Sequence, residues 1–507
     1  MGVSLSNLEV GRMVLDRPVA VLVVSFLVYI TWRLIYNRHL HPLRRYPGPF
    51  LSTASRLPFA IAYAKGTLHL HSQALHRKYG DVVRIAPDEL SYTDEQAWKD
   101  IYGASRNFPK DTRFYNASTK KAPSVLTAPD NVHSCQKRAI LRAFSETALR
   151  DHERVLQPLV GEFIDQLGHI SEQKNGVVDF EQWYNYIMFD FMAKELFGET
   201  LGCLKHAAFH PWADMLFASI KAWAFLSVIK YFPYFTFILK PLVLFYCRDL
   251  LRHRDAKHNS IASKTPQRSE VMPLIPDFIS YISDSTDPKS TLLPKELFAN
   301  TSFLMMAGSE TTATLLSGCT YLLLKNPATY TELATQVRSL FRSPSEMTFA
   351  AATRIPYLRS VLQESLRMYP PLPLGMPRVV PAGGALISGR YVPEKTSVSV
   401  SSWSAYQSPK NFTNPRTFLP ERWLDSEHEV GGGDKQGVFQ PFSLGPRGCP
   451  GRSLAFAEAS LIISRLVWEF DLELAEDSRD WGVGQRAFIV WDKGPLHVRL
   501  VKRAENV

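Results

Sequence analysis

Two long apolar stretches dominate the hydrophobic pattern of this 507-residue chain. The first, Val19 to Trp32, contains no charged residue. The second, Pro294 to Lys325, opens with a proline, a residue suited to the first turn of a helix, so the pattern predicts one helix about 48 Å long. Its residues Phe303, Ala307 and Thr311 recur every four positions and would share one face. A hydroxyl on a buried apolar face requires a functional reason.

Shorter patterns complete the predicted elements. The segment Glu364-Ser365-Leu366-Arg367 lies near the end of a predicted helix, which Tyr369-Pro370 terminates. Between Pro371 and Val400, glycines separate short β-branched runs, a pattern typical of a hairpin followed by a strand. The fold class predicted from the whole chain is mainly α with a small β-rich part.

The N-terminal apolar run predicts an uncleaved membrane anchor. Fourteen helical residues would span about 21 Å, short of the roughly 30 Å of a hydrocarbon core, and a secretory signal peptide is the alternative. The run ends in large residues, and the positive charges after it place the following domain in the cytoplasm. We therefore expect an anchor at 1–37, a basic, proline-containing hinge at 38–50 and one large domain at 51–507.

Charge and cysteine content narrow the class of protein. The net charge of +10 and the pI near 9.2 would suit a protein that binds nucleic acid, but the sequence contains no base-reading module and no Arg/aromatic stripe. The five cysteines, an odd number with scattered spacing, form neither a disulfide framework nor a zinc site. The chain therefore belongs in a reducing compartment.

The most informative segment surrounds Cys449, within Phe442-Ser443-Leu444-Gly445-Pro446-Arg447-Gly448-Cys449-Pro450-Gly451. Glycines let a loop aim N–H groups at the sulfur, and Arg447 adds a positive charge, so we expect the thiolate form to be favoured. A buried structural cysteine beside a turn is the alternative. Pro450 lacks an N–H and removes one donor that could point at the sulfur.

This loop has the pattern F-x-x-G-x-R-x-C-x-G and resembles the proximal haem loop of the cytochrome P450 superfamily. The resemblance covers nearly the whole chain, and segments such as Ala143-Phe144-Ser145 are similar to fungal secondary-metabolite monooxygenases, including trichothecene hydroxylases. It implies the P450 fold and haem b, with Cys449 as the axial iron ligand. The loop residues that it assigns to the cofactor are Phe442, Gly445, Arg447 and Gly451.

The resemblance also implies roles on the long helix. Ala307 and Gly308 would lie against the haem, and the helix would open locally so that Thr311 can hydrogen-bond dioxygen. Glu310 would relay protons. The substrate pocket would be lined by Phe303, Leu374 and Met376, and the aromatic-rich segment Leu216 to Phe245 would roof it.

Further residues are assigned to haem and to its support. Arg378 would contact a haem propionate. Relatives offer Trp and Arg on the helix that crosses the haem, where this chain has His133 and Lys137, with Arg138 as the alternative to the lysine. Glu364, Arg367 and Arg422 would form a buried structural triad.

The expected function follows from the same resemblance. The protein would be an endoplasmic-reticulum haem-thiolate monooxygenase that inserts one oxygen atom from dioxygen into a lipophilic small molecule. Electrons would come from NADPH through cytochrome P450 reductase, and cytochrome b5 is a further expected partner. Basic residues on the cysteine side would attract the acidic reductase: Lys137, Arg138, Arg142, Arg447 and Arg452. A haem-thiolate isomerase or dehydratase and a non-catalytic membrane haem binder are the alternatives, and the substrate cannot be read from these residues.

Overall fold

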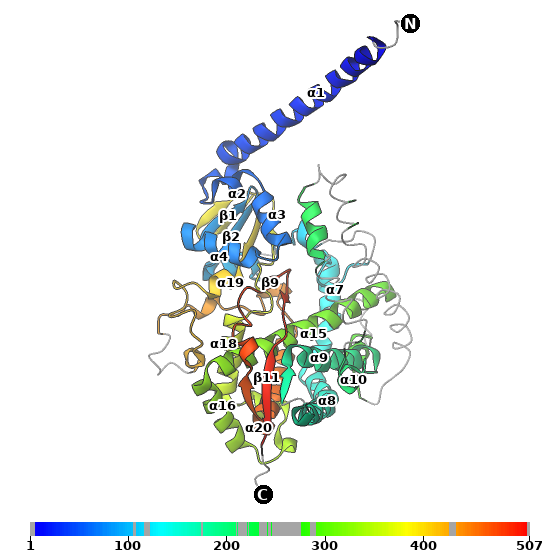
Figure 1. Ribbon diagram of the computed structural model, residues 1–507, viewed down its shortest axis with the longest axis vertical. Coiled ribbons are helices and arrows are strands. Elements are labelled where there is room, and N and C mark those ends of the chain that lie inside the picture. The colour runs from blue at the N-terminus through cyan, green and yellow to red at the C-terminus, as the bar shows by residue number, and fades with distance from the viewer. Residues whose placement is uncertain are drawn as a thin grey trace.

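The computed structural model describes residues 6–104, 108–115, 122–173, 176–208, 210, 221, 223–232, 241, 245, 275–283, 291–424 and 432–503. Cys247 and most of the predicted roof segment Leu216 to Phe245 lie outside these residues. The described part is mainly helical with small sheets, as predicted, and one long helix, α1 (Ser6–Ile35), projects from the body at the N-terminal end (Figure 1).

The helical part is built around α15 (Pro294–Lys325), which has the bounds predicted from the sequence. Proline begins the helix, and Asn326, followed by the proline of the next helix, ends it. The neighbouring long helices contribute buried apolar side chains to one continuous core. They are α8 (Glu146–Gln173), α9 (Phe180–Phe197), α16 (Pro327–Leu340), α18 (Pro356–Met368) and α20 (Arg452–Glu469).

The largest sheet lies near the foot of α1, beside three short helices (Figure 1). Its strand order is β1-β2-β7-β4, with β2 and β7 parallel and the other two pairs antiparallel. The strands are β1 (Val82–Ala86), β2 (Glu89–Tyr92), β7 (Ser397–Val400) and β4 (Arg378–Val379). The three helices are α2 (Phe50–Ala54), α3 (Leu57–Ala64) and α4 (Leu68–Tyr79).

The predicted hairpin between Pro371 and Val400 is confirmed. It consists of β5 (Ala385–Ile387) and β6 (Arg390–Val392), with Gly389 in a left-handed conformation at its turn. A second hairpin near the C-terminus joins β9 (Arg486–Ala487) and β10 (Trp491–Asp492).

A three-stranded sheet completes the β-rich part, in the order β3-β11-β8. Its strands are β3 (Val177–Asp179), β11 (His497–Lys502) and β8 (Phe470–Leu474). The helices that join these parts are α5 (Glu95–Tyr102), α6 (Thr112–Tyr115), α7 (Asp130–Leu141), α10 (Cys203–His206), α14 (Phe278–Ser283), α17 (Phe349–Thr353) and α19 (Ser402–Tyr406).

Helix α1 carries exposed apolar side chains, including Val21, Val24 and Leu27. Nevertheless, no helix in the described part of the chain is both long and apolar enough to cross a membrane. The packed body begins within the predicted anchor, because Asn37 is buried and donates a hydrogen bond of 2.8 Å to the carbonyl oxygen of Ala54. The anchor boundary predicted at residue 37 therefore includes a residue that packs on the following domain.

Candidate functional site

The cysteine loop is a short 3-10 turn, Gly445–Arg447, that leads into α20. The Cys449 N–H donates a hydrogen bond of 2.8 Å to the carbonyl oxygen of Phe442, which closes the loop. Gly445 has a φ of +68°, and a Cβ there would collide with the Tyr102 carbonyl oxygen, so both the conformation and the close approach require glycine. The loop therefore packs tightly against the end of α5.

Cys449 differs from the other described cysteines in accessibility. Cys203 and Cys319 are buried and Cys135 is half-buried, whereas Cys449 is exposed. Protein still surrounds its sulfur on most sides, and this burial raises the pKa of the thiol. The Gly451 N–H and the charge of Lys137 lower that pKa only in part. The expectation that the loop by itself favours the thiolate is therefore wrong, because burial outweighs the donors.

The cation that acts on the sulfur is Lys137 rather than Arg447. Lys137 Nζ donates hydrogen bonds to the carbonyl oxygens of Pro446 (2.6 Å) and Gly448 (2.9 Å), two loop residues that shortly precede Cys449. Arg447 forms an ion pair with Asp130 at the start of α7. Its second guanidinium nitrogen, Nη1, is buried and has no hydrogen-bond partner in the described part of the chain.

Several further basic side chains gather beside Arg447. Arg378 is buried and donates a hydrogen bond of 2.8 Å to the Tyr115 hydroxyl. Lys110, a residue that sequence reasoning missed, has a pKa lowered to about 6 by burial and by the charges of Arg447, Arg378 and Lys137. Like charges this close repel one another unless an anion lies between them.

His133 belongs to the same group. It is buried on α7, and burial together with the charges of Lys110, Lys137 and Arg378 lowers its pKa to about 4. The ring is therefore neutral at pH 7 and offers one N–H donor and no charge. Arg138, the alternative to Lys137, is exposed.

Three predicted residues of α15 lie on one face. Phe303, Ala307 and Thr311 are all half-buried, and Thr311 Oγ1 donates a hydrogen bond of 2.6 Å to the Ala307 carbonyl oxygen. The helix is continuous from Pro294 to Lys325, so the local opening expected near Thr311 is absent. A Cβ at Gly308 would overlap the flexible end of the Met192 side chain on α9. The Met192 side chain therefore occupies the space that a side chain at position 308 would take.

Glu310 is buried and turned toward the C-terminal hairpin. Adjacent residues on a helix project about 100° apart, so Glu310 leaves the face that carries Thr311. Its Oε1 lies 2.8 Å from Lys493 Nζ and accepts a hydrogen bond of 3.1 Å from Thr314. Lys493 is another residue that the sequence did not indicate.

The three residues of the predicted triad are in contact and buried. Arg367 donates two hydrogen bonds of 2.8 Å to the two carboxylate oxygens of Glu364, and Arg422 Nε donates one of 3.1 Å to Glu364 Oε1. Trp423 Nε1 also donates to Glu364 Oε2, at 2.9 Å, and Arg422 forms an ion pair with buried Asp434. The carboxylate therefore accepts four side-chain donors, a level of pairing that a buried charge requires.

The three predicted pocket residues differ in their surroundings. Leu374 lines a cavity of about 30 Å³ together with Phe114 and Tyr231. Met376 is half-buried between the two apolar clusters of the sheet region, and Phe303 packs on neither of them. The cavity at Leu374 has room for about one water molecule.

A second buried polar cluster lies on the other side of α15. Thr312 Oγ1 donates a hydrogen bond of 2.9 Å to Glu458 on α20, and burial raises the pKa of Glu458 to about 8. His152 Nδ1 lies 2.9 Å from Glu195 Oε2, and both residues are fully buried. The charges of His152 and Glu195 act on Glu458, so the three groups form one electrostatic unit.

Comparisons with known proteins agree with the resemblance seen in the sequence. The family model described as "Cytochrome P450" matches residues 49–497. The "Cytochrome P450 monooxygenase astJ" of Aspergillus oryzae (strain ATCC 42149 / RIB 40) is 40% identical over 477 residues, which cover 93% of this chain and 94% of that protein. The "Cytochrome P450 monooxygenase lcsI" of Purpureocillium lilacinum is 41% identical, over 94% and 92% of the two chains. The "Averantin hydroxylase" of Dothistroma septosporum (strain NZE10 / CBS 128990) is 38% identical, over 97% and 93%.

Proposed function

Since the chain belongs to the cytochrome P450 family and is a haem-dependent monooxygenase, we propose that it hydroxylates, or oxidises in a related way, a lipophilic small molecule. The relatives reported above are fungal P450 monooxygenases, and one of them is named as a hydroxylase. These names support a place in fungal secondary metabolism. Identity near 40% does not transfer a substrate.

The residues around Cys449 fit haem. Arg378, Arg447 and Lys137 bring positive charge to one place around Lys110, and Arg447 Nη1 is buried without a partner in the described residues. The two propionate carboxylates of haem are the anions that such a group of cations requires. Coordination to a metal removes the thiol proton outright, so the raised pKa of the free Cys449 thiol does not prevent it from binding as a thiolate. This buried guanidinium nitrogen without a partner in the described residues, two residues before Cys449 in the chain, is the observation that carries the proposal.

Each of these residues has a distinct part in holding the cofactor. Cys449 would bind the iron, and Arg378 and Arg447 would pair with propionates. Neutral His133 would donate one N–H. Lys137 already donates two hydrogen bonds to the loop and keeps one N–H for an anion. When bound, haem supplies the iron that activates dioxygen.

The chain itself would supply the protons. Thr311 Oγ1 bonds the Ala307 carbonyl oxygen on the face shared with Phe303, and rotation of its hydroxyl would let it donate to an oxygen on that face. Glu310, the adjacent carboxyl, would hold the proton that replaces the one given by Thr311. The apolar surroundings of α15 would keep bulk water from this exchange.

Electrons would arrive from NADPH through a reductase that docks on the cysteine side. Arg138 and Arg452 are exposed, and Arg142 is half-buried, so these three can meet a partner. Lys137 and Arg447 turn inward to the cysteine loop and Asp130, and they contribute less to such a surface than the sequence indicated. An acidic partner such as the reductase or cytochrome b5 would be attracted to the exposed arginines.

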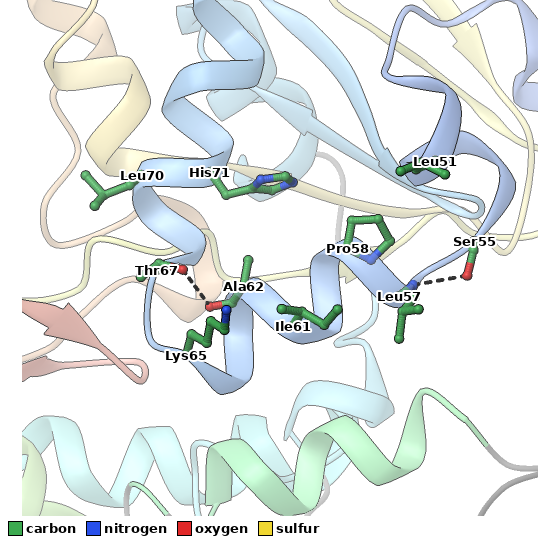
Figure 2. Close-up of a pocket in the computed structure, with 10 residues that line it drawn as sticks. All are labelled: Leu51, Ser55, Leu57, Pro58, Ile61, Ala62, Lys65, Thr67, Leu70 and His71. Carbon is green, nitrogen blue, oxygen red and sulfur yellow. Dashed lines mark hydrogen bonds between the residues drawn. The ribbon is translucent and has the colours of Figure 1, made fainter.

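Membrane association would come from α1 and from an apolar groove at its foot. The groove has a volume of about 700 Å³, and Figure 2 shows that its lining comes from α2, α3 and α4. Leu51 is 67% exposed and Leu57 is 53% exposed, and Ile61 and Leu70 are also exposed. This apolar surface lies close to the exposed apolar side chains of α1, so we propose that a lipid bilayer covers both. The endoplasmic-reticulum membrane, with the haem domain on its cytoplasmic side, is the bilayer that we expect.

One experiment tests the reaction class. Membranes containing the enzyme and a fungal P450 reductase are supplied with NADPH, ¹⁸O₂ and the metabolite that accumulates when the gene is deleted. A monooxygenase transfers one ¹⁸O atom to the product and requires both NADPH and reductase. Conversion without dioxygen would instead support an isomerase or dehydratase, and haem binding without any turnover would support a haem carrier.

A further inference from the structure

A fully buried histidine holds the turn that follows α7. His152 on α8 is 0% exposed, and its Nε2 lies 2.8 Å from the carbonyl oxygen of Ala143. Ala143 belongs to the short 3-10 turn Arg142–Phe144, and the last carbonyl groups of a helix have no partner within that helix. His152 therefore supplies the donor that this buried backbone oxygen requires.

A carboxyl group fixes which ring nitrogen of His152 donates. Nδ1 lies 2.9 Å from Glu195 Oε2 on α9, and both side chains are fully buried. An ionised carboxylate only accepts, so Nδ1 carries a proton when it faces one, and a protonated carboxyl can instead donate to a bare Nδ1. Nε2 holds its own proton in both cases. The bond to Ala143 therefore does not depend on where the pair keeps its shared proton.

The same turn carries Phe144, whose ring reaches the cysteine loop. A Cβ at Gly451 would lie 3.3 Å from Phe144 Cε1 and 3.8 Å from Cys449 Sγ. The edge of the ring and the sulfur therefore border one small space, which Gly451 leaves open because it has no side chain. Ring edges carry partial positive charge, and sulfur contacts at a ring edge are favourable. An aromatic edge in this place suits a negatively charged thiolate.

A second aromatic ring supports Phe144 from α14. Phe278 meets Phe144 in a T-shaped contact with the ring centroids 5.2 Å apart. The His152 ring stacks on Phe278, with centroids 4.6 Å apart and an angle of 17° between the ring planes. The Phe278 N–H also donates a hydrogen bond of 3.2 Å to Glu195 Oε2. The His152–Glu195 pair thus holds Phe144 twice, through the Ala143 backbone and through the Phe278 ring.

Phe144 stands where the packed interior meets solvent. It is half-buried, and Leu141 and Ser145, on either side of the turn, are exposed. Water that passed this ring could give a proton to the Cys449 sulfur, and the thiolate rather than the thiol is the metal ligand. Stability alone is a poor reason for the buried polar pair behind the ring, because apolar groups of similar volume often replace such a pair at no cost. The pair instead fixes the position of the ring.

From these contacts we propose that His152 is a positioning residue for the iron ligand: together with Glu195 it holds the Phe144 ring against the cysteine loop, where the ring keeps water from the Cys449 sulfur. The segment Ala143-Phe144-Ser145, noted in the sequence only for its resemblance, thereby gains a role at the haem site. This inference rests on the proposed function, because it requires Cys449 as the iron ligand.

The test follows the ferrous carbon monoxide complex of the full-length holoenzyme over time. One readout is the rate at which the thiolate-type absorption band is lost, and the other is the total haem that stays bound. The variants are His152→Leu, Phe144→Leu and the double mutant, with His169→Leu, at an exposed position of the same helix, as the matched control. If the wild type shows no thiolate-type band, the role of Cys449 fails before this inference is tested.

We expect His152→Leu and Phe144→Leu each to lose the band about tenfold faster than wild type, the change that loss of one buried hydrogen bond produces. The haem itself should stay bound while the band disappears. The double mutant should be no faster than Phe144→Leu, because the histidine acts through that ring. Additive effects of the two substitutions, or a band that disappears only as haem is released, would show a merely structural role and overturn the inference.

Two variants keep the test decisive if His152→Leu fails to fold. His152→Gln has an amide that can still donate to the Ala143 carbonyl oxygen, so it should keep most of the stability of the band. Phe144→Leu changes only a half-buried ring and leaves the buried polar pair intact. A wild-type rate of band loss in Phe144→Leu would contradict the role of the ring, and with it the role of His152.

Discussion

Lys137 Nζ lies 2.9 Å from the carbonyl oxygen of Gly448, the residue before the cysteine of the haem loop. This contact joins α7 to the loop across more than 300 residues of chain. The same contact holds Lys137 where its charge lowers the pKa of the Cys449 thiol, and no other cation of α7 has this effect. Lys137 is therefore part of the site's framework, and its inward orientation separates it from the exposed Arg138.

We predict that Lys137→Ala lowers haem occupancy in the purified protein. The variant loses two hydrogen bonds that hold the loop and one charge beside the propionate site. Occupancy is measured as the ratio of haem to protein absorbance. Arg138→Ala is the matched control: it should keep full occupancy and raise the reductase concentration needed for half-maximal turnover. Full haem occupancy in Lys137→Ala together with weakened reductase coupling would assign this lysine to the surface that binds the reductase.

We predict that Thr311→Ala still oxidises NADPH but diverts the electrons to peroxide. Loss of a positioned proton donor should lower product per NADPH by about a hundredfold or more, while substrate affinity changes little. Ser317→Ala is the control, because Ser317 makes the same type of bond on α15, 2.8 Å to the Ala313 carbonyl oxygen, and is fully buried. Wild-type coupling in Thr311→Ala would refute the role of its hydroxyl.

The sequence predicted elements and contacts that depend on local pattern or on the family motif. The bounds of α15 follow from a proline at its start and Asn326-Pro327 at its end. Arg422 lies 58 residues from Glu364, and only the resemblance connected the two.

Other contacts had no signal in the sequence. Lys493 is 183 residues from Glu310 and follows a two-residue strand that no periodicity marks. Lys110 bonds two carbonyl oxygens in a loop, a contact that any surface lysine could make. The expected direction of the Cys449 pKa was wrong because the sequence shows charges and donors but not the depth of burial.

The raised pKa of Glu458 predicts a pH-dependent stability. Its ordinary value is 4.5 and its value in the fold is about 8, so the folded state keeps a proton that the unfolded state releases. This stabilisation is complete below pH 4.5 and is lost as the pH rises toward 8, by about 1.4 kcal/mol per pH unit. Glu458→Gln cannot ionise, so its Tm relative to wild type should rise steadily from pH 5 to pH 8.

The control for this measurement is Ser460→Ala. Ser460 is a buried residue of the same helix and does not titrate in this range, so its Tm difference from wild type should be constant across the series. A constant difference for Glu458→Gln as well would show that Glu458 is ionised throughout.

Deletion of residues 1–35 should weaken membrane association and leave the haem site intact. The deletion ends before Asn37, whose hydrogen bond to Ala54 belongs to the packed body. Residual binding should remain through the groove of Figure 2, and Leu57→Glu with Ile61→Glu in the shortened protein should remove it. Flotation with liposomes measures both steps. Equal flotation of the shortened and full-length proteins would show that α1 is not the principal anchor.

The ferrous carbon monoxide spectrum of Cys449→Ser tests the central claim most directly, namely that this one thiolate binds the haem iron. Cys135→Ser serves as the control, since Cys135 is the other described cysteine with an accessible surface. The account predicts that Cys449→Ser loses the thiolate-type absorption band while Cys135→Ser keeps it. A Cys449→Ser protein that retained the band would assign the iron to another ligand and contradict the account.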